Sequence, residues 1–395
     1  MNATLGEGLR AEIPGRVKGL QASLAATGLD GALLLHSVDV YYYSGTRQNV
    51  ALWIPAAGEA SLLVRKGAAR ARSESPLPGV RPFPPGRELA ALFGNARRVG
   101  LCFDVTRLSQ WEWWRKHLPR IDFADASALV RAQRSVKSPL ELKALRQGGE
   151  KLAAVFREIP SFLRAGMREL DLAAEIELRL RRAGCQGSPR LRAPNLELFS
   201  GLVVSGEAGA EPGGFDGPVA GRGLSAAYPV GPSERVIRTG EPVFVDYAAL
   251  FGGYILDVTR VFALGSLPED LERAHEVAIA IQDELAPLLA PGQIPADLYA
   301  RATDQAEAAG LGAFFMGHGE EASRFVGHGL GLELDEMPVL ALGFHEPLTE
   351  GQVLALEPKF VFPGRGAVGI ENSWAVTRGG GERLTPLPDA LVRVP

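Results

Sequence analysis

The chain has 395 residues, of which 46% are hydrophobic, so it can bury the core of a globular protein with two or three domains. Its formal net charge of -4 gives no electrostatic case for binding nucleic acid or an anionic membrane surface. The sequence shows no signal-peptide pattern and no apolar run of about 20 residues, so the cytoplasm is the expected location. Cys102 and Cys185 form no CxxC pair and are expected to be buried thiols.

Residues 1–133 are predicted to form an α/β domain. Its first part reads as an amphipathic helix, a glycine turn and an apolar strand, all within residues 16–37. Residues 49–67 resemble a β-hairpin, because two β-rich runs are joined by proline and glycine. A short buried strand at 97–105 and a helical turn at 109–118 follow. The tryptophans of that turn are expected in a core or interface rather than on a ligand.

Residues 134–395 are predicted to form a second domain. Ser138 and Glu141 form a capping box around Pro139, which predicts a helix start there. A second helix is expected up to a C-cap at Gly184, and another helix pair is expected over 268–310. The order helix, helix, hairpin thus occurs twice, which predicts two pseudo-twofold halves. A long Gly/Pro-rich loop, residues 205–234, has the composition of a lid or a substrate-contacting segment.

Two acidic residues mark the first hairpin of this domain, "EPVFVDYAALFGGYILDVTRVFAL". Counted from a turn centre between Phe251 and Gly252, Asp246 and Asp257 are expected to face each other. At an effective dielectric of 20, two carboxylates at 4 Å repel by roughly 4 kcal/mol. The repulsion has to be offset by a shared proton, a basic partner or a metal cation.

A second hairpin repeats the pattern, because Glu357 and Glu371 are equidistant from Gly364. His328 adds an imidazole between Gly327 and Gly329, whose small size lets neighbouring backbones approach closely. Four carboxylates and one imidazole suit two divalent ions such as Mn, Co, Fe or Zn. Two metal ions about 3.5–4 Å apart can hold a bridging hydroxide and polarise a carbonyl.

These residues resemble the metal site of the family that includes methionine aminopeptidase, aminopeptidase P and prolidase. The patterns "GGYILDVTR", "GHGLGLEL", "LEPKF" and "GIEN" carry the resemblance, and "GLDGALLL" and "YYYSG" are similar to the N-terminal domain of the prolidase and creatinase branch. The resemblance implies an α/β chain with a creatinase-like N-terminal domain and a pita-bread α+β catalytic domain. It also implies a homodimer.

The same resemblance implies the roles of the residues. The ligands of two divalent ions, manganese foremost, would be Asp246, Asp257, His328, Glu357 and Glu371. Asp257 would serve both ions, with Asp246 on one side. Glu357 would also handle the proton of a bridging hydroxide that attacks an amide carbonyl, as in a Xaa-Pro dipeptidase or aminopeptidase.

The chain departs from the family around the metal ligands. Histidines expected at three positions are replaced by Arg324, Asp335 and Pro229, an expected arginine is Gly369, and an expected tyrosine is Val361. Loss of one oxyanion donor commonly costs about 3–4 kcal/mol of transition-state stabilisation.

The replacements carry chemistry of their own. Arg324 offers a donor for an oxyanion or a substrate carboxylate, and Asp335 can bind an amine or pair with Arg324. Lys359, beside Glu357, can add a second cation. The leading hypothesis is a metallohydrolase of small peptides or amides. The alternatives are a non-peptide C–N hydrolase or a lyase on the same metal site, and a non-catalytic binding relative.

Overall fold

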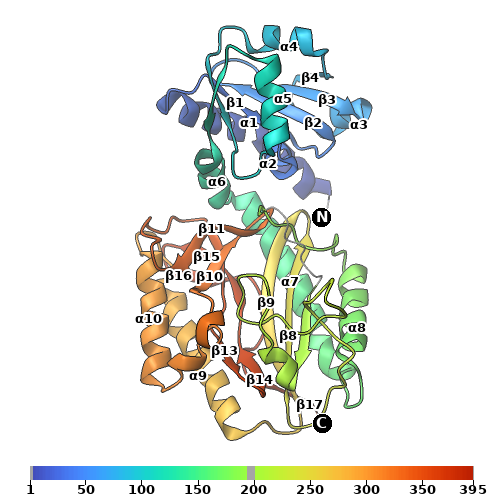
Figure 1. The fold of residues 1–395 in the computed structure, drawn as a ribbon, viewed down its shortest axis with the longest axis vertical. Helices are drawn as coiled ribbons and strands as arrows, with labels where there is room; N and C mark the ends of the chain where they lie inside the picture. Colours follow the sequence, from blue (N-terminus) through green and yellow to red (C-terminus); the bar gives the residue numbers. More distant parts are fainter. Residues whose placement is uncertain (1–2, 194–200, 395) are drawn as a thin grey trace. The chain divides into compact units, whose positions relative to one another are not determined.

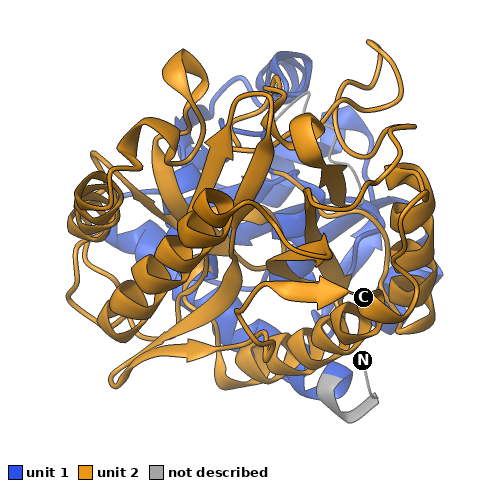
Figure 2. Cartoon of the chain, turned by 90° about the horizontal axis from the view of Figure 1, so that it is seen from below, with its two compact units in different colours: residues 1–134, 192–194 blue, residues 135–191, 195–395 orange. Residues whose placement is uncertain are grey.

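The computed structural model describes residues 3–193 and 201–394. The chain forms two compact units, residues 1–134 with 192–194 and residues 135–191 with 195–395 (Figure 2). Within the first unit, Arg192 returns to the N-terminal residues through ion pairs to Asp39 at 3.0 Å and Asp104 at 2.6 Å. No helix in the described part of the chain is long and apolar enough to cross a membrane.

The first unit is built on one mixed six-stranded sheet in the order β4-β3-β2-β1-β5-β6. Its strands are β1 Gly31–Leu34, β2 Asn49–Pro55, β3 Ser61–Lys66, β4 Gly79–Pro82, β5 Arg98–Leu101 and β6 Asp122–Asp125. Its helices are α1 Ala3–Ala26, α2 Ser37–Ser44, α3 Ala68–Glu74, α4 Gly86–Phe93, α5 Leu108–His117 and α6 Ser127–Ser135. The predicted hairpin is the antiparallel pair β2–β3. Trp114 is buried in the core, as expected for this aromatic cluster.

The second unit places two helix pairs around the strands that carry the acidic residues (Figure 1). The helices are α7 Pro139–Glu158, α8 Glu169–Arg182, α9 Glu269–Leu285 and α10 Pro295–Ala308. A four-stranded sheet has the order β17-β9-β8-β7, with β7 Leu202–Ser205, β8 Pro242–Phe251, β9 Tyr254–Leu264 and β17 Val392–Val394. Helix α7 packs on β8 and β9, and α8 packs on β7.

A five-stranded sheet in the order β11-β10-β12-β15-β16 forms the other half of this unit. Its strands are β10 Phe325–Leu330, β11 Leu334–Ala341, β12 Val353–Leu356, β15 Asn372–Thr377 and β16 Gly380–Arg383. Strands β13 Lys359–Phe362 and β14 Gly366–Gly369 form a separate hairpin against α9, while α10 packs on β10 and β11. The helix, helix, hairpin order expected from the sequence therefore recurs.

The start of α7 is fixed by the predicted capping box. The Ser138 hydroxyl accepts a hydrogen bond from the Glu141 backbone N–H at 3.2 Å, and the Glu141 carboxylate accepts one from the Ser138 N–H at 2.9 Å. Pro139 occupies the first helical position, where a missing N–H costs nothing. This local chemistry is independent of tertiary packing, so it can be predicted from the sequence.

The predicted register of the first acidic hairpin was wrong by two residues. Phe251 pairs with Tyr254, so the turn is Gly252-Gly253, and both glycines have positive φ as a tight two-residue turn requires. Asp246 therefore stands opposite Thr259, and Asp257 opposite Ala248. The two aspartates share a face as diagonal neighbours, and diagonal placement weakens their direct repulsion.

Candidate metal centre

Five elements converge to bring the expected ligands together. Asp246 lies on β8, Asp257 on β9 and His328 on β10, whereas Glu357 follows β12 and Glu371 follows β14. The pairs Leu356–Asn372 and Lys359–Gly369 flank the two glutamates with one shared register. Glu357 and Glu371 are thus level with each other, as counting from Gly364 predicted.

Backbone contacts join the two acidic hairpins. Thr259 and Glu371 form a β-bridge, and the Thr259 hydroxyl donates to the Glu371 carboxylate at 2.8 Å. Ser373 accepts from the Asp257 N–H at 2.8 Å and donates to the Asp257 carbonyl at 2.9 Å. These contacts fix the Glu371 carboxylate and the backbone of Asp257 relative to each other.

Glycine is required on both sides of His328 for a steric reason. Strand β10 lies between β11 and β12, and a Cβ on Gly327 would lie only 2.4 Å from the carbonyl oxygen of Ala355 on β12. A Cβ on Gly329 would lie 2.4 Å from the carbonyl oxygen of Glu336 on β11. Glycine on both sides lets the neighbouring strands close around the histidine.

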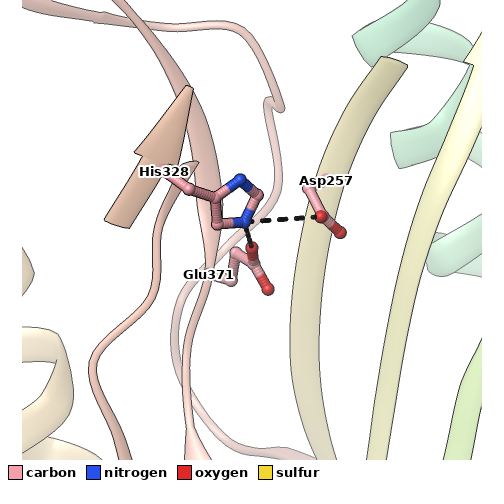
Figure 3. Close-up of side chains that lie close together, drawn as sticks. All are labelled: Asp257, His328 and Glu371. Atoms are coloured by element: carbon pink, nitrogen blue, oxygen red, sulfur yellow. Dashed lines mark ion pairs between the residues drawn. The ribbon is translucent and has the colours of Figure 1, made fainter. Parts of the chain in front are cut away.

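The two ring nitrogens of His328 have different environments. Nε2 points toward two of the carboxylates, at 3.8 Å from Glu371 Oε1 and 4.0 Å from Asp257 Oδ2 (Figure 3). It also lies 3.3 Å from Glu357 Oε1. Nδ1 lies 3.4 Å from Asp335 Oδ1. A carboxylate on the far nitrogen is the usual way of orienting a metal-binding histidine.

Lys359 supplies a cation inside the cluster. Its Nζ lies 2.7 Å from Glu357 Oε2, 2.9 Å from Glu371 Oε2 and 3.0 Å from Asp246 Oδ2. The residue is 2% exposed, so these ion pairs are formed away from water. One of the expected ways to offset the carboxylate repulsion was a basic partner. Lys359, from the second hairpin, is such a partner.

The pKa shifts show that the cluster still attracts positive charge. Burial and the neighbouring carboxylates raise the pKa of Glu371 to about 8, although Lys359 opposes this. Burial and Glu371 raise the pKa of Asp257 well above its ordinary value. Burial alone would lower the pKa of His328, but Glu357, Asp335 and Asp257 outweigh it and raise that pKa well above normal.

Glu357 behaves in the opposite way. Burial raises its pKa, but the charges of Lys359 and His328 outweigh that effect, and the pKa falls to about 2. Its carboxylate is therefore ionised at neutral pH beside the Lys359 ammonium.

Three of the residues fit one divalent ion. Ligand atoms of Asp257, His328 and Glu371 all lie within 4.8 Å of one another, and Asp257 Oδ1 is buried without a hydrogen-bond partner. Carboxylate and imidazole donors suit Mn, Fe, Co or Zn. The position beside Asp246, where the resemblance implies a second ion, does not fit one as it stands, because the Lys359 ammonium lies there.

A cavity of about 310 Å³ opens onto the cluster. Residues 214–219 of the long loop, together with Pro229 and Val230, form part of its wall. The loop therefore reaches the site, as its length and composition predicted, and Pro229 stands where the resemblance expects a histidine. Asp216 and Asp335 add acidic groups to the lining.

The other replacements lie in different places. Arg324 is exposed and is not among the described residues that line the cavity. Val361 is buried on β13, and Gly369 stands opposite Lys359 on β14. The sequence predicted Lys359 as a second cation but not its place among three of the expected ligands. The signal was available, since Lys359 lies two residues after Glu357 and so on the same face of an extended segment.

Comparisons with known proteins agree with this geometry. The metallopeptidase family M24 model matches residues 143–378, and the creatinase/prolidase N-terminal domain model matches residues 16–136. A Xaa-Pro dipeptidase of Pyrococcus furiosus is 25% identical over 94% of this chain and 97% of that protein. A probable dipeptidase PepE of Mycobacterium bovis is 28% identical over 98% of each chain.

Solved structures extend the likeness to the whole fold. The Xaa-Pro dipeptidase from Bacillus anthracis matches with a TM-score of 0.82 and 26% identity, over 96% of this chain and 99% of that one. The dipeptidase PepE from Mycobacterium ulcerans matches with a TM-score of 0.82 and 25% identity, over 98% and 99% of the two chains. The family resemblance and the fold class inferred from the sequence are confirmed. This chain is a member of metallopeptidase family M24, a family of metal-dependent hydrolases.

Proposed function

We propose that this protein hydrolyses small peptides or amides, with Xaa-Pro dipeptides as its foremost substrates. The observation that carries the proposal is the buried convergence of Asp257, His328 and Glu371 at a cavity, with Glu357 beside them. The relatives named Xaa-Pro dipeptidase support the substrate class. A cavity of about 310 Å³ is at the lower end of the range for small-ligand pockets, which suits a dipeptide.

The lining of the cavity supports the same substrate. Pro189, Pro218 and Phe215 offer apolar surface for a prolyl ring. Asp216 and Asp335 lie at the same cavity and can attract the amino group of a short peptide. We assign positive charge in the cavity to Lys359 rather than to the exposed Arg324, because only Lys359 lines it.

Each residue of the cluster then has a role. A divalent ion bound in the cluster would polarise the scissile carbonyl and lower the pKa of a water molecule. Asp257, His328 and Glu371 would hold that ion, and Asp335 keeps the His328 ring in place. Glu357 accepts the proton of the attacking water, and Asp246 holds the Lys359 ammonium.

Manganese is the first ion to test, since the donors are mostly carboxylate oxygens. We further propose a homodimer and a cytoplasmic location. Light scattering during gel filtration and fractionation of cells, respectively, test these two assignments.

Other chemistry on the same site is the second candidate function. Arg324, Asp335 and Pro229 stand where the family resemblance expects histidines, and a lysine enters the ligand set. These changes favour a non-peptide C–N hydrolase or a lyase over a peptidase that has merely lost activity. A non-catalytic binding protein is disfavoured, because binding a partner does not require a buried ligand set.

The test is turnover of Xaa-Pro dipeptides and longer peptides by protein loaded with Mn²⁺. Glu357→Gln removes the proton acceptor and should lower the rate by about 10²–10⁴. Glu276→Gln, an exposed glutamate on α9, is the matched control and should leave the rate unchanged. Absence of turnover in metal-loaded wild type would turn the assignment toward the second candidate.

A further inference from the structure

Lys359 has the surroundings of a bound cation rather than of a surface lysine. Its three N–H donors meet three carboxylates, at 2.7 Å from Glu357, 2.9 Å from Glu371 and 3.0 Å from Asp246. The face of the Phe244 ring lies on a further side, with its centroid 5.7 Å from Nζ. All the hydrogen-bonding capacity of the ammonium is therefore used within the cluster.

Glu357 and Glu371 divide their oxygens between two positions. Each turns Oε2 toward the Lys359 ammonium and Oε1 toward His328 Nε2. Two carboxylates that bridge in this way define two adjacent cation positions. The first contains the ammonium and is closed by Asp246, and the second is closed by Asp257 and His328.

We propose that the Lys359 ammonium permanently replaces one of the two metal ions of the family, so that this chain binds a single divalent ion at Asp257, His328 and Glu371. The second half of this statement rests on the proposed metal-dependent function, whereas the first half does not.

A divalent ion cannot share the first cation position with the Lys359 ammonium. A divalent ion needs its carboxylate oxygens at about 2.0–2.2 Å. Nζ already lies within 3.0 Å of the oxygens of Asp246, Glu357 and Glu371 that such an ion would use. An ion at bonding distance from all three would overlap the ammonium, and two positive charges in contact would also repel each other strongly.

The opposite strand is adapted to the lysine. Gly369 pairs with Lys359, and a Cβ at residue 369 would lie 2.7 Å from Lys359 Cα and 2.9 Å from its Cγ. A side chain at 369, such as the arginine that the resemblance expects, would push the lysine stem out of the cluster. The two departures from the family pattern are therefore parts of one arrangement.

The exchange changes the chemistry available at the site. An ammonium supplies one positive charge where a metal ion supplies two, and it accepts no lone pair from water or from a carbonyl. Substrate activation would then depend on a single Lewis acid, with Lys359 acting only as a fixed charge and hydrogen-bond donor.

Metal stoichiometry tests the replacement directly. Purified full-length protein is saturated with Mn²⁺, freed of excess ion and analysed by inductively coupled plasma mass spectrometry against protein concentration. Wild type should hold one ion per chain, and Lys359→Ala should hold two, because removal of the ammonium leaves three carboxylates facing an open position.

The matched control removes another buried lysine. Lys137 is 4% exposed and pairs with Glu336 at 3.2 Å, outside the ligand set. Lys137→Ala should leave the stoichiometry of wild type unchanged. Two ions in wild type, or no additional ion in Lys359→Ala, would overturn the proposal.

Two further outcomes separate this proposal from the proposed function. If wild type holds no ion but Lys359→Ala gains one, the replacement stands and the metal-dependent function fails. If wild type holds one ion and Lys359→Ala holds two, but wild type hydrolyses no peptide, the replacement stands and only the substrate assignment fails. Should Lys359→Ala not fold, anomalous scattering at the manganese edge from crystals of wild type counts the ions instead, and two peaks would contradict the replacement.

Discussion

The Asp335 carboxylate lies 3.4 Å from Nδ1 of His328, on the other side of the ring from the Nε2 atom that faces Asp257 and Glu371. The backbone of Asp335 has a φ of 59°, a left-handed conformation that aspartate and asparagine tolerate better than most residues. The chain thus accepts a less common backbone geometry to bring this carboxylate to the histidine.

Asp335→Asn should weaken binding of Mn²⁺ by about 10–100-fold, the usual effect of losing a carboxylate behind a ligating histidine. Asparagine keeps the left-handed backbone, so the effect reports on the charge. Isothermal titration calorimetry measures it. Asp216→Asn removes another carboxylate from the cavity wall and should change the affinity little. Equal losses in the two variants would argue for a general field effect instead of orientation of the ring.

Gly369→Ala should lower the free energy of unfolding by about 1–3 kcal/mol, as overpacked sites do. The added Cβ would lie 2.6 Å from the Pro358 carbonyl oxygen and 2.7 Å from Cα of Lys359, which pairs with residue 369, and such backbone atoms cannot move aside cheaply. Urea denaturation followed by circular dichroism gives the value. Gly214→Ala is the control, because a Cβ there meets no atom within 4 Å. A stability equal to that of wild type would show that β14 can shift away from Lys359.

Addition of Mn²⁺ should stabilise the folded chain, because the proposed ligands come together only in that state. At a free ion concentration of 100 times Kd, one site contributes about 2.7 kcal/mol to the free energy of unfolding. Asp257→Asn should lose most of this gain, whereas Asp283→Asn, an exposed change on α9, should keep it. Thermal unfolding with and without a chelator measures the difference. A gain that survives in Asp257→Asn would place the ion elsewhere.

His275 should make the protein sensitive to mild acid. Burial lowers the pKa of this histidine from 6.5 to about 4, although the backbone carbonyl of Asp389, 3.1 Å from Nε2, opposes the shift. Between pH 6.5 and about pH 4, His275 binds a proton in the unfolded chain but not in the folded chain. His275 therefore does not reduce the free energy of unfolding above pH 6.5, but it lowers that free energy by about 3 kcal/mol as the pH drops to 4.

His275→Gln removes the titration and keeps a side-chain donor near Asp389. Urea unfolding at several pH values should give a shallower loss for the variant than for wild type across this window. Parallel curves for the two proteins would assign the acid sensitivity to other groups.

Local signals predicted much of the fold. The capping box at Ser138, the helix pairs and the hairpins follow from short-range chemistry, and the level placement of Glu357 and Glu371 follows from symmetry about Gly364. The Asp246–Asp257 register could not be read as reliably, because moving the turn centre by one residue shifts the pairing by two. A shift of two residues changes the pairing partner but not the face of the strand, so Asp246 and Asp257 still lie on one face.

The contacts of the cations depended on tertiary structure. Lys359 and Arg324 are both basic residues near a ligand in the sequence, yet one is buried among three carboxylates and the other is exposed. Nothing in the spacing of Asp335 tells whether it meets an amine, Arg324 or His328. The pairing of β10 with β11 decides this contact. It sets Gly329 opposite Glu336 and so brings Asp335 to the His328 imidazole.

The bridge between Thr259 and Glu371 has a consequence for how the protein matures. It joins hairpins that are far apart along the chain, and such long-range pairing forms late, after the loops between have closed. A partly folded chain can present single residues of the proposed metal site but not the whole set. Metal uptake during refolding should therefore coincide with the last cooperative step, and manganese ions should neither template nor accelerate the earlier ones.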